Sequence, residues 1–268
     1  MLRAMGLRVW SPPTRTAALP SAPAEAPAEA PVPAAAAPGP VAAPALPAVA
    51  RPQLVPLAAT WPQPAPRTIE GVASMDWSAL RDAVAHCRAC ALCDSRTQTV
   101  FGVGHWQAHW MVVGEAPGEQ EDLSGEPFVG AAGQLLDRML AALSLTRAED
   151  GPAPPAQRVY IANTLKCRPP RNRNPVAEES AQCEPYLVRQ IQLLQPRLIL
   201  AMGRFAVQSL LRSDEPIGRL RGRVHRYQGV PLVVTYHPAY LLRNLPDKAK
   251  AWEDLCLAAS VAEAATTQ

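Results

Sequence analysis

The sequence of 268 residues has no run of about 20 continuous apolar residues, the length that a membrane-spanning helix needs. Its start, residues 1–8, carries arginine but lacks the uninterrupted hydrophobic stretch of a secretory signal. The prolines that follow disfavour the amphipathic helix of an organelle transit peptide. Nothing indicates an oxidising compartment, which makes disulfides unlikely candidates for the cysteines. We therefore expect a cytoplasmic protein that does not contact a membrane.

The first seventy residues also lack the apolar bulk of a folded domain. They hold 16 of the 30 prolines, and their only aromatic residues are Trp10 and Trp61. Such a tract cannot offset the entropy lost on ordering, and repeated proline blocks helix and sheet alike. We predict a disordered Pro/Ala-rich arm over residues 1–74, acting as a spacer, and one domain over residues 75–265 that is long enough to bury a single core.

The net charge of +3 conceals an uneven distribution of charge. Residues 76–150 contain 11 acidic and 5 basic side chains, whereas residues 158–250 contain 16 basic and 6 acidic ones. A basic half of this kind is typical of a surface that faces a polyanion such as DNA. A solvated basic face is the alternative, and charge alone does not exclude it.

Short apolar segments alternate with helical patterns in the second part of the chain. Strands are predicted at 110–113, 159–161, 198–200 and 230–235, and helices at 77–90, 135–143, 176–194, 205–211 and 248–262. This alternation predicts a mainly parallel four-stranded sheet covered by helices on both faces, a three-layer αβα sandwich. In such sheets ligands bind at the carboxyl ends of the strands, which directs attention to the four loops there.

Six cysteines are present, and their spacing permits a metal site. Cys87 and Cys90 form a C-x2-C pair, and Cys167 and Cys183 could complete a set of four thiolates around one metal centre. Buried thiols without metal are the alternative, because free cysteine is among the most buried residue types. Cys93 offers a second pairing with Cys90. Spacing therefore fixes neither the ligand set nor the choice between zinc and an iron–sulfur cluster.

Polar residues follow three of the predicted strands. Glu115 begins a loop with four carboxylates in residues 115–122, Asn163 follows the second strand, and His237 follows the fourth. A carboxylate can orient or deprotonate water, and an amide offers a donor and an acceptor to a base edge. Each residue alone is more often structural. Their convergence on one edge of the sheet favours an active site.

Four segments carry a family resemblance, and they occur in a fixed order along the chain: Gly114-Glu115-Ala116-Pro117-Gly118, Gly125-Glu126-Pro127-Phe128-Val129-Gly130, Asn163-Thr164-Leu165-Lys166-Cys167-Arg168-Pro169-Pro170 and His237-Pro238-Ala239-Tyr240-Leu241-Leu242-Arg243. Together they resemble the family 4 uracil-DNA glycosylases, the iron–sulfur branch of that superfamily. The resemblance spans residues 87–243 and leaves the arm outside it. It implies that residues 75–265 form a glycosylase domain with the αβα fold.

The resemblance also implies a [4Fe–4S] cluster with a structural role. By position, its ligands are Cys87, Cys90, Cys167 and Cys183. Cys93 and Cys256 match no ligand position, and we expect both of them to contribute to packing.

By the same resemblance, the target base leaves the stack and enters a pocket. Phe128 would stack on uracil, and Asn163 would bind the edge that distinguishes uracil from cytosine. Main-chain N–H groups near Ala116 would hold the carbonyls, and Glu121 would crowd the methyl group of thymine. The implied recognition set is therefore selective for uracil.

For the reaction, the resemblance implies that Glu115 orients the attacking water and that His237 stabilises negative charge on the departing uracil. One or two residues of a wedge would fill the space that the base leaves. The wedge candidates are Tyr240, Leu241 and Leu242, and the candidates for phosphate contacts are Arg168, Arg171, Asn172, Arg173, Arg243 and the arginines of residues 219–226.

Glu115 favours the uracil-selective branch of the superfamily, because the family 5 relatives tend to carry an apolar residue at that position. Another relative binds uracil-DNA covalently through a histidine, and residues 168–175 contain none. The expected partner is uracil-containing DNA, single- or double-stranded, bound by a monomer associated with the nucleoid. Two rival hypotheses remain: a non-catalytic nucleic-acid-binding module with structural zinc, and a hydrolase of free nucleotides.

Overall fold

A computed structural model describes residues 71–265; the arm predicted over residues 1–74 lies, apart from residues 71–74, outside this range. Six strands form one sheet in the order β1-β3-β2-β4-β6-β5. The strands are β1 (Val103–Gly104), β2 (Trp110–Gly114), β3 (Val159–Asn163), β4 (Leu198–Met202), β5 (Val224–Tyr227) and β6 (Val230–Thr235).

Eight α-helices and four short 3-10 helices connect the strands in the described range. The α-helices are α1 (Trp77–Ala85), α2 (Glu119–Ser124), α3 (Ala131–Ala142), α4 (Ala177–Leu194), α5 (Arg204–Leu211), α6 (Ile217–Leu220), α7 (Pro238–Arg243) and α8 (Asp247–Ala264). The 3-10 helices are η2 (Val72–Ser74), η3 (Ala91–Asp94), η4 (Pro155–Gln157) and η5 (Pro170–Asn172). Helix α1 begins at a capping residue: the side chain of Asp76 accepts a hydrogen bond of 2.8 Å from the N–H of Ala79.

The centre of the sheet is parallel. Strands β3, β2, β4 and β6 are all parallel neighbours, and every residue of β2, β3 and β4 is buried. Burial on both faces explains why these segments are continuous apolar runs without alternation. The register pairs Gly114 with Asn163, so the loops after β2 and β3 leave the sheet side by side.

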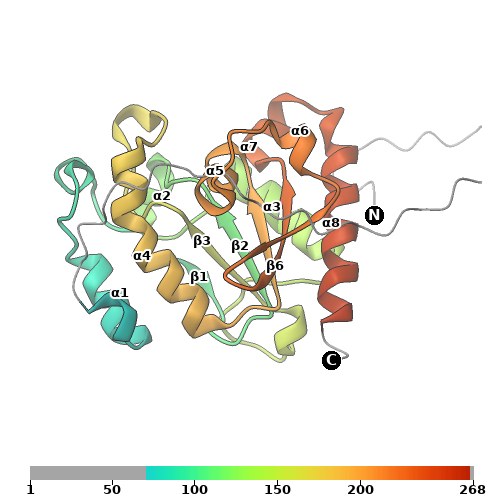
Figure 1. Cartoon of the computed structure of the whole chain (residues 1–268), viewed down its shortest axis with the longest axis horizontal. Helices are drawn as coiled ribbons and strands as arrows, with labels where there is room; N and C mark the ends of the chain where they lie inside the picture. The colour runs from blue at the N-terminus through green and yellow to red at the C-terminus, as the bar shows by residue number, and fades with distance from the viewer. Residues whose placement is uncertain (1–70, 266–268) are drawn as a thin grey trace, which may run out of the picture.

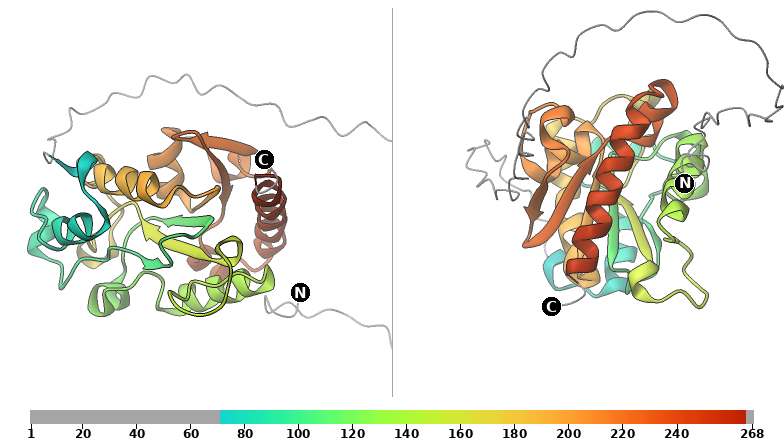
Figure 2. Two further views of the ribbon diagram at one scale, coloured as in Figure 1. Left: turned by 90° about the horizontal axis from the view of Figure 1, so that it is seen from below. Right: turned by 90° about the vertical axis from the view of Figure 1, so that its right-hand side faces the viewer.

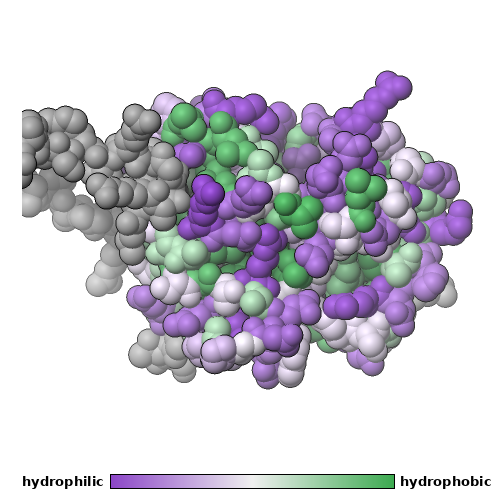
Figure 3. Space-filling view, turned by 180° about the vertical axis from the view of Figure 1, so that it is seen from behind, coloured by the Kyte–Doolittle hydropathy of each residue, from purple (hydrophilic) through white to green (hydrophobic). Residues whose placement is uncertain are grey.

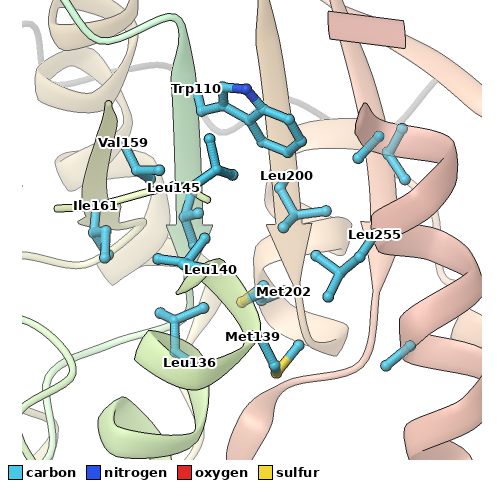
Figure 4. Close-up of a cluster of buried hydrophobic side chains, with 14 of the residues drawn as sticks. Trp110, Leu136, Met139, Leu140, Leu145, Val159, Ile161, Leu200, Met202 and Leu255 are labelled. Atoms are coloured by element: carbon cyan, nitrogen blue, oxygen red, sulfur yellow. The ribbon is translucent and has the colours of Figure 1, made fainter. Parts of the chain in front are cut away.

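One face of the sheet is covered by α3, α7 and α8. Figure 4 shows Met139 of α3 beside Met202 of β4 and Leu255 of α8 beside Leu200 of β4, and all four are fully buried. Helix α8 lies across β6 and β4 in Figure 2. Leu241 of α7 packs in this layer, which fixes His237, the N-cap residue of α7, two residues after the end of β6.

The opposite face is covered by α4 and α5. Leu187 and Ile191 of α4 and Val207 of α5 pack against the alternate side chains of the same strands. Figure 1 shows α1 beside α4, at the end of the molecule away from α8. There Leu80 and Val84 form a separate cluster with residues of η2 and α4.

The predicted αβα fold is confirmed, and its four predicted strands form the parallel centre of the sheet. Two antiparallel edge strands, β1 beside β3 and β5 beside β6, were not predicted. The first helix was predicted too long: α1 ends at Ala85, and Cys87 and Cys90 lie in the irregular segment that follows.

On the face shown in Figure 3, hydrophilic residues predominate, and hydrophobic ones lie in small groups between them. Within residues 71–265, no helix has the length and apolar character required to cross a membrane.

Candidate active site

The carboxyl ends of the parallel strands open into a cleft of about 830 Å³, within the range of roughly 300–1,000 Å³ that is usual for ligand sites. Glu115, Asn163 and His237 all line it, because β2, β3 and β6 end at this edge. Its walls further include the predicted residues Ala116, Glu121, Phe128, Asn172, Arg173, Tyr240 and Arg243, and the residues Arg204, Phe205, Ile217 and Tyr236, which were not predicted.

Glu115 is the first residue after β2. Its carbonyl accepts hydrogen bonds from the hydroxyl of Thr164 (2.6 Å) and the N–H of Leu165 (3.1 Å), which joins the loops after β2 and β3. Burial raises the pKa of the Glu115 carboxyl to about 7. A group that titrates near neutrality is well matched to taking a proton from water.

Asn163 provides an acceptor without a partner. The residue is 2% exposed, and within residues 71–265 its Oδ1 atom has no hydrogen-bond partner. A Cβ atom on Gly114 would lie 2.4 Å from this oxygen and 2.7 Å from the Phe128 ring, so only glycine permits this approach. A buried polar atom without a partner is unfavourable unless a ligand satisfies it. The geometry indicates a donor in the ligand.

Phe128 and His237 bring two rings together. Their centroids are 5.3 Å apart, with an angle of 26° between the planes. The Nδ1 atom of His237 accepts a hydrogen bond of 3.2 Å from the N–H of Ala239. Burial lowers the pKa of His237 to about 4, although the carboxylate of Glu121 opposes the shift. The ring is therefore neutral at pH 7, and its proton is on Nε2, where it can be donated.

Glu121 joins the two loops that form one wall of the cleft. Its carboxylate accepts hydrogen bonds of 3.1 Å each from the N–H groups of Gly118 and Val129. Both oxygens are thus engaged by the main chain. Sequence reasoning predicted a role in excluding thymine and did not predict this connection.

Helix α7 corrects one residue of the predicted wedge. Leu241 is fully buried in the core with α3 and α8, so it is not available to DNA. Leu242 is 43% exposed, and Leu245, which was not predicted, is 56% exposed. The hydroxyl of Tyr240 donates to Asp247 (2.6 Å), and its ring stacks on Tyr236.

The arginine-rich loop after Cys167 is held by ion pairs and hydrogen bonds. Both terminal nitrogens of the Arg173 guanidinium donate to the buried carboxylate of Glu179, at 2.5 and 2.9 Å. Arg168 donates to the Asn172 side chain at 2.7 Å. Arg171 is exposed, with a φ of 57°. Arg173 is therefore engaged by Glu179, whereas Arg171 extends from a strained turn.

The expected phosphate contact of Arg221 is also corrected. Its guanidinium forms ion pairs with Glu253 and the buried Asp254, and only 15% of the side chain is exposed. Arg221 thus connects the segment after α6 to α8 and is not free for DNA.

The other site predicted from the sequence is a cavity around which five thiols gather, here called the thiol cavity: Cys87, Cys90, Cys93, Cys167 and Cys183. The irregular segment after α1 supplies Cys87 and Cys90, η3 supplies Cys93, the loop after β3 supplies Cys167, and α4 supplies Cys183. Cys256 is exposed on α8, so its predicted packing role is wrong. Within the described range, no three His, Cys, Asp or Glu side chains are grouped as ligands of a single metal ion.

Two basic residues, Arg96 and Lys166, line the thiol cavity. Arg96 donates to the sulfur of Cys167 (3.0 Å) and to the carbonyl of Cys87 (2.8 Å). Burial raises the pKa of Cys183 to about 12, and it also raises that of Cys167. Thiols so buried ionise only when a cation compensates the charge, and soft thiolate donors are the ligands that iron–sulfur clusters and zinc select. The donor set thus fits the implied cluster.

Comparison with known proteins identifies the family. The model of the uracil DNA glycosylase superfamily matches residues 101–256. A type-4 uracil-DNA glycosylase of Archaeoglobus fulgidus is 46% identical over 164 residues, which are 58% of this chain and 78% of that protein. A type-4 enzyme of Pyrobaculum aerophilum is 40% identical over 193 residues, which are 68% and 93% of the two chains. The chain belongs to the type-4 uracil-DNA glycosylases. A type-5 enzyme of P. aerophilum is less similar, at 32% identity over 151 residues, 53% of this chain and 66% of that protein.

Membership of the type-4 uracil-DNA glycosylases confirms the family predicted from the four motifs. Sequence reasoning missed Arg96, Tyr236 and Leu245, although a basic residue so near a C-x2-C pair was a usable signal for Arg96. It also missed Lys166, which is fully buried at the thiol cavity. A lysine read from sequence normally suggests surface charge.

Proposed function

We infer that this chain removes uracil from DNA by hydrolysing the N-glycosidic bond, the step that initiates base excision repair. The single observation that carries this inference is the unpartnered Oδ1 of Asn163, buried in a cleft that also contains Glu115 and His237. The names of the type-4 relatives support the same activity.

Selectivity for uracil would follow from the Asn163 amide. Uracil presents an N–H between two carbonyls, so the amide can accept at Oδ1 and donate at Nδ2. Cytosine reverses this pattern and would leave both polar groups unpaired, which disfavours it strongly. Main-chain N–H groups near Ala116 would hold a carbonyl, Phe128 would stack on the base, and Glu121 would crowd the methyl group of thymine.

Hydrolysis would use the two other residues. As the bond from the sugar to N1 of uracil breaks, its electron pair moves onto the base, where the Nε2–H of His237 stabilises the charge by a hydrogen bond. Water adds to the anomeric carbon, and the Glu115 carboxylate takes its proton. A neutral histidine suits this role, because it stabilises the anion without carrying a charge in the resting cleft.

DNA binding would place the uracil strand over the open side of the cleft. Uracil must leave the duplex to reach Asn163, and Leu242 with Tyr240 would fill the vacated space. Phosphate contacts are assigned to Arg168, Arg171, Asn172, Arg173 and Arg243. Such contacts weaken as salt rises.

A [4Fe–4S] cluster would be held by Cys87, Cys90, Cys167 and Cys183, and it would supply structural connection between the segment after α1, the loop after β3 and α4. We further propose that residues 75–265 are the catalytic domain and residues 1–74 a spacer. The protein would act as a monomer on single- or double-stranded uracil-containing DNA, in the cytoplasm at the nucleoid.

The test is release of uracil from an oligonucleotide by anaerobically purified protein. Glu115→Gln should abolish release, whereas Glu178→Gln, on the exposed first turn of α4, is the matched control and should not. A cytosine-containing strand should release no base. Folded, brown protein that binds the uracil strand but releases nothing would favour the non-catalytic module. Hydrolysis of free nucleotides alone would favour the nucleotide hydrolase.

A further inference from the structure

A buried lysine lies between the thiol cavity and the cleft. Lys166 is 1% exposed. Its Nζ donates to the carbonyl of Asn163 at 2.8 Å and to the Oε1 of Gln190 at 2.7 Å. The side chain thus holds the main chain of the residue that carries the unpartnered oxygen.

The same residue adjoins the thiols. Lys166 lines the thiol cavity together with Cys167 and Cys183, and Cys167 follows it directly in the chain. One residue therefore lies beside the proposed cluster ligands and contacts the main chain of the base-recognition residue through its side chain.

Gln190 fixes the position of the ammonium group. It is fully buried in α4, and its Nε2 donates to the carbonyl of Phe101 at 2.9 Å and the hydroxyl of Tyr160 at 3.3 Å. Asn163 and Tyr160 lie in β3 and Gln190 lies in α4, whereas Phe101 precedes β1. The hydrogen bonds of Lys166 and Gln190 thus connect β3 to α4.

Burial of this lysine is tolerated because of its surroundings. The hydrogen-bond partners of its Nζ are two neutral oxygens, and the thiols of the adjoining cavity, once ionised as cluster ligands, would compensate its charge. The ammonium group is therefore matched to an occupied thiol cavity on one side and to the carbonyl of Asn163 on the other.

We propose that Lys166 is a positioning residue that couples the thiol cavity to uracil recognition, because it lines that cavity directly before Cys167 and its side chain holds the carbonyl of Asn163. This proposal rests on the proposed function, since it assigns the Asn163 amide to uracil. By this coupling, uracil binding would alter the environment of the cluster, and a change at the cluster would alter the affinity for uracil, because linkage is reciprocal.

The test compares Lys166→Met with Arg138→Met, which removes a charge from the exposed side of α3. Both holoproteins are purified anaerobically, and iron content, affinity for free uracil and the visible circular dichroism of the cluster with and without uracil are measured. Lys166→Met should retain its iron but bind uracil roughly tenfold more weakly, the effect of losing a hydrogen bond from a charged group. The change that uracil produces in the cluster spectrum should disappear. Arg138→Met should match the wild type in all three.

Gln190→Leu provides a second variant, since it removes an anchor and leaves Lys166 in place. It should weaken uracil binding roughly threefold. Unchanged uracil affinity in both variants would overturn the proposal. So would loss of iron from Lys166→Met with normal uracil binding by the loaded fraction, which would make the residue purely structural. Wild-type protein that neither binds uracil nor releases it would refute the proposed function itself.

Discussion

Gly114→Ala should close the base pocket. The new Cβ atom would lie 2.4 Å from Oδ1 of Asn163 and 2.7 Å from the Phe128 ring, whereas ordinary contact begins near 3.4 Å. The shortfall at Asn163 is about 1 Å, and a misplacement of about 1 Å at a reacting site lowers the rate by about 100-fold. Because Asn163 and Phe128 are 2% and 5% exposed, neither can move without disturbing its neighbours, and overpacking should lower stability by about 1–3 kcal/mol.

The assay is single-turnover release of uracil with enzyme in excess, together with thermal unfolding of each protein. Gly130→Ala is the matched control: it adds the same methyl group where nothing lies within 4 Å, so it should keep the wild-type rate. Gly114→Ala that releases uracil at the wild-type rate would show that the base does not bind between Asn163 and Phe128.

Three further predictions test separate parts of the argument. Excision should increase as pH rises through about 7, because burial raises the pKa of Glu115 to that value. Since the pKa of Glu115 is higher in the folded than in the unfolded protein, ionisation of this carboxyl lowers the stability as pH rises from about 4.3 toward 7. At pH 8, Glu115→Gln should therefore melt at a higher temperature than the wild type. Leu241→Ala should lower the free energy of unfolding by about 2–5 kcal/mol. Leu242→Ala should leave the free energy of unfolding unchanged and slow uracil excision from duplex DNA more than from single strands. Equal losses of stability would refute the assignment of Leu241 to the core and of Leu242 to the DNA wedge. Arg96→Met should bleach faster in air, followed by visible absorbance, since it loses the hydrogen bond to Cys167.

The parallel centre of the sheet could be predicted because burial on both faces leaves an unmistakable pattern of continuous apolar residues. The edge strands could not. Strand β1 has two residues, one of them glycine, and β5 contains His225 and Arg226 among its four. Only pairing with a neighbouring strand makes such short, mixed segments extended.

The cleft residues could be predicted because three strand ends each carry one polar residue, and the topology of a parallel sheet brings strand ends together. No comparable pattern in the sequence shows which side of a short helix such as α7 faces the core. Leu241 and Leu242 are adjacent and alike in sequence, and only the packing of α7 on α3 and α8 separates the buried leucine from the exposed one. The hydrogen bonds of Glu121 likewise depend on distances between loops that no spacing along the chain encodes.

The edges of the sheet have a consequence for association between copies. A long unpaired strand is a template onto which another chain can add, which leads to aggregation. Here β1 offers only two residues, and β5 carries the exposed Arg226. Strand β5 pairs along Val230–Val233 of β6, and β1 pairs with Tyr160 and Ile161 of β3, so two antiparallel strands occupy the edges of the parallel sheet. The outer edges of the sheet therefore offer little regular main chain onto which a second copy could add.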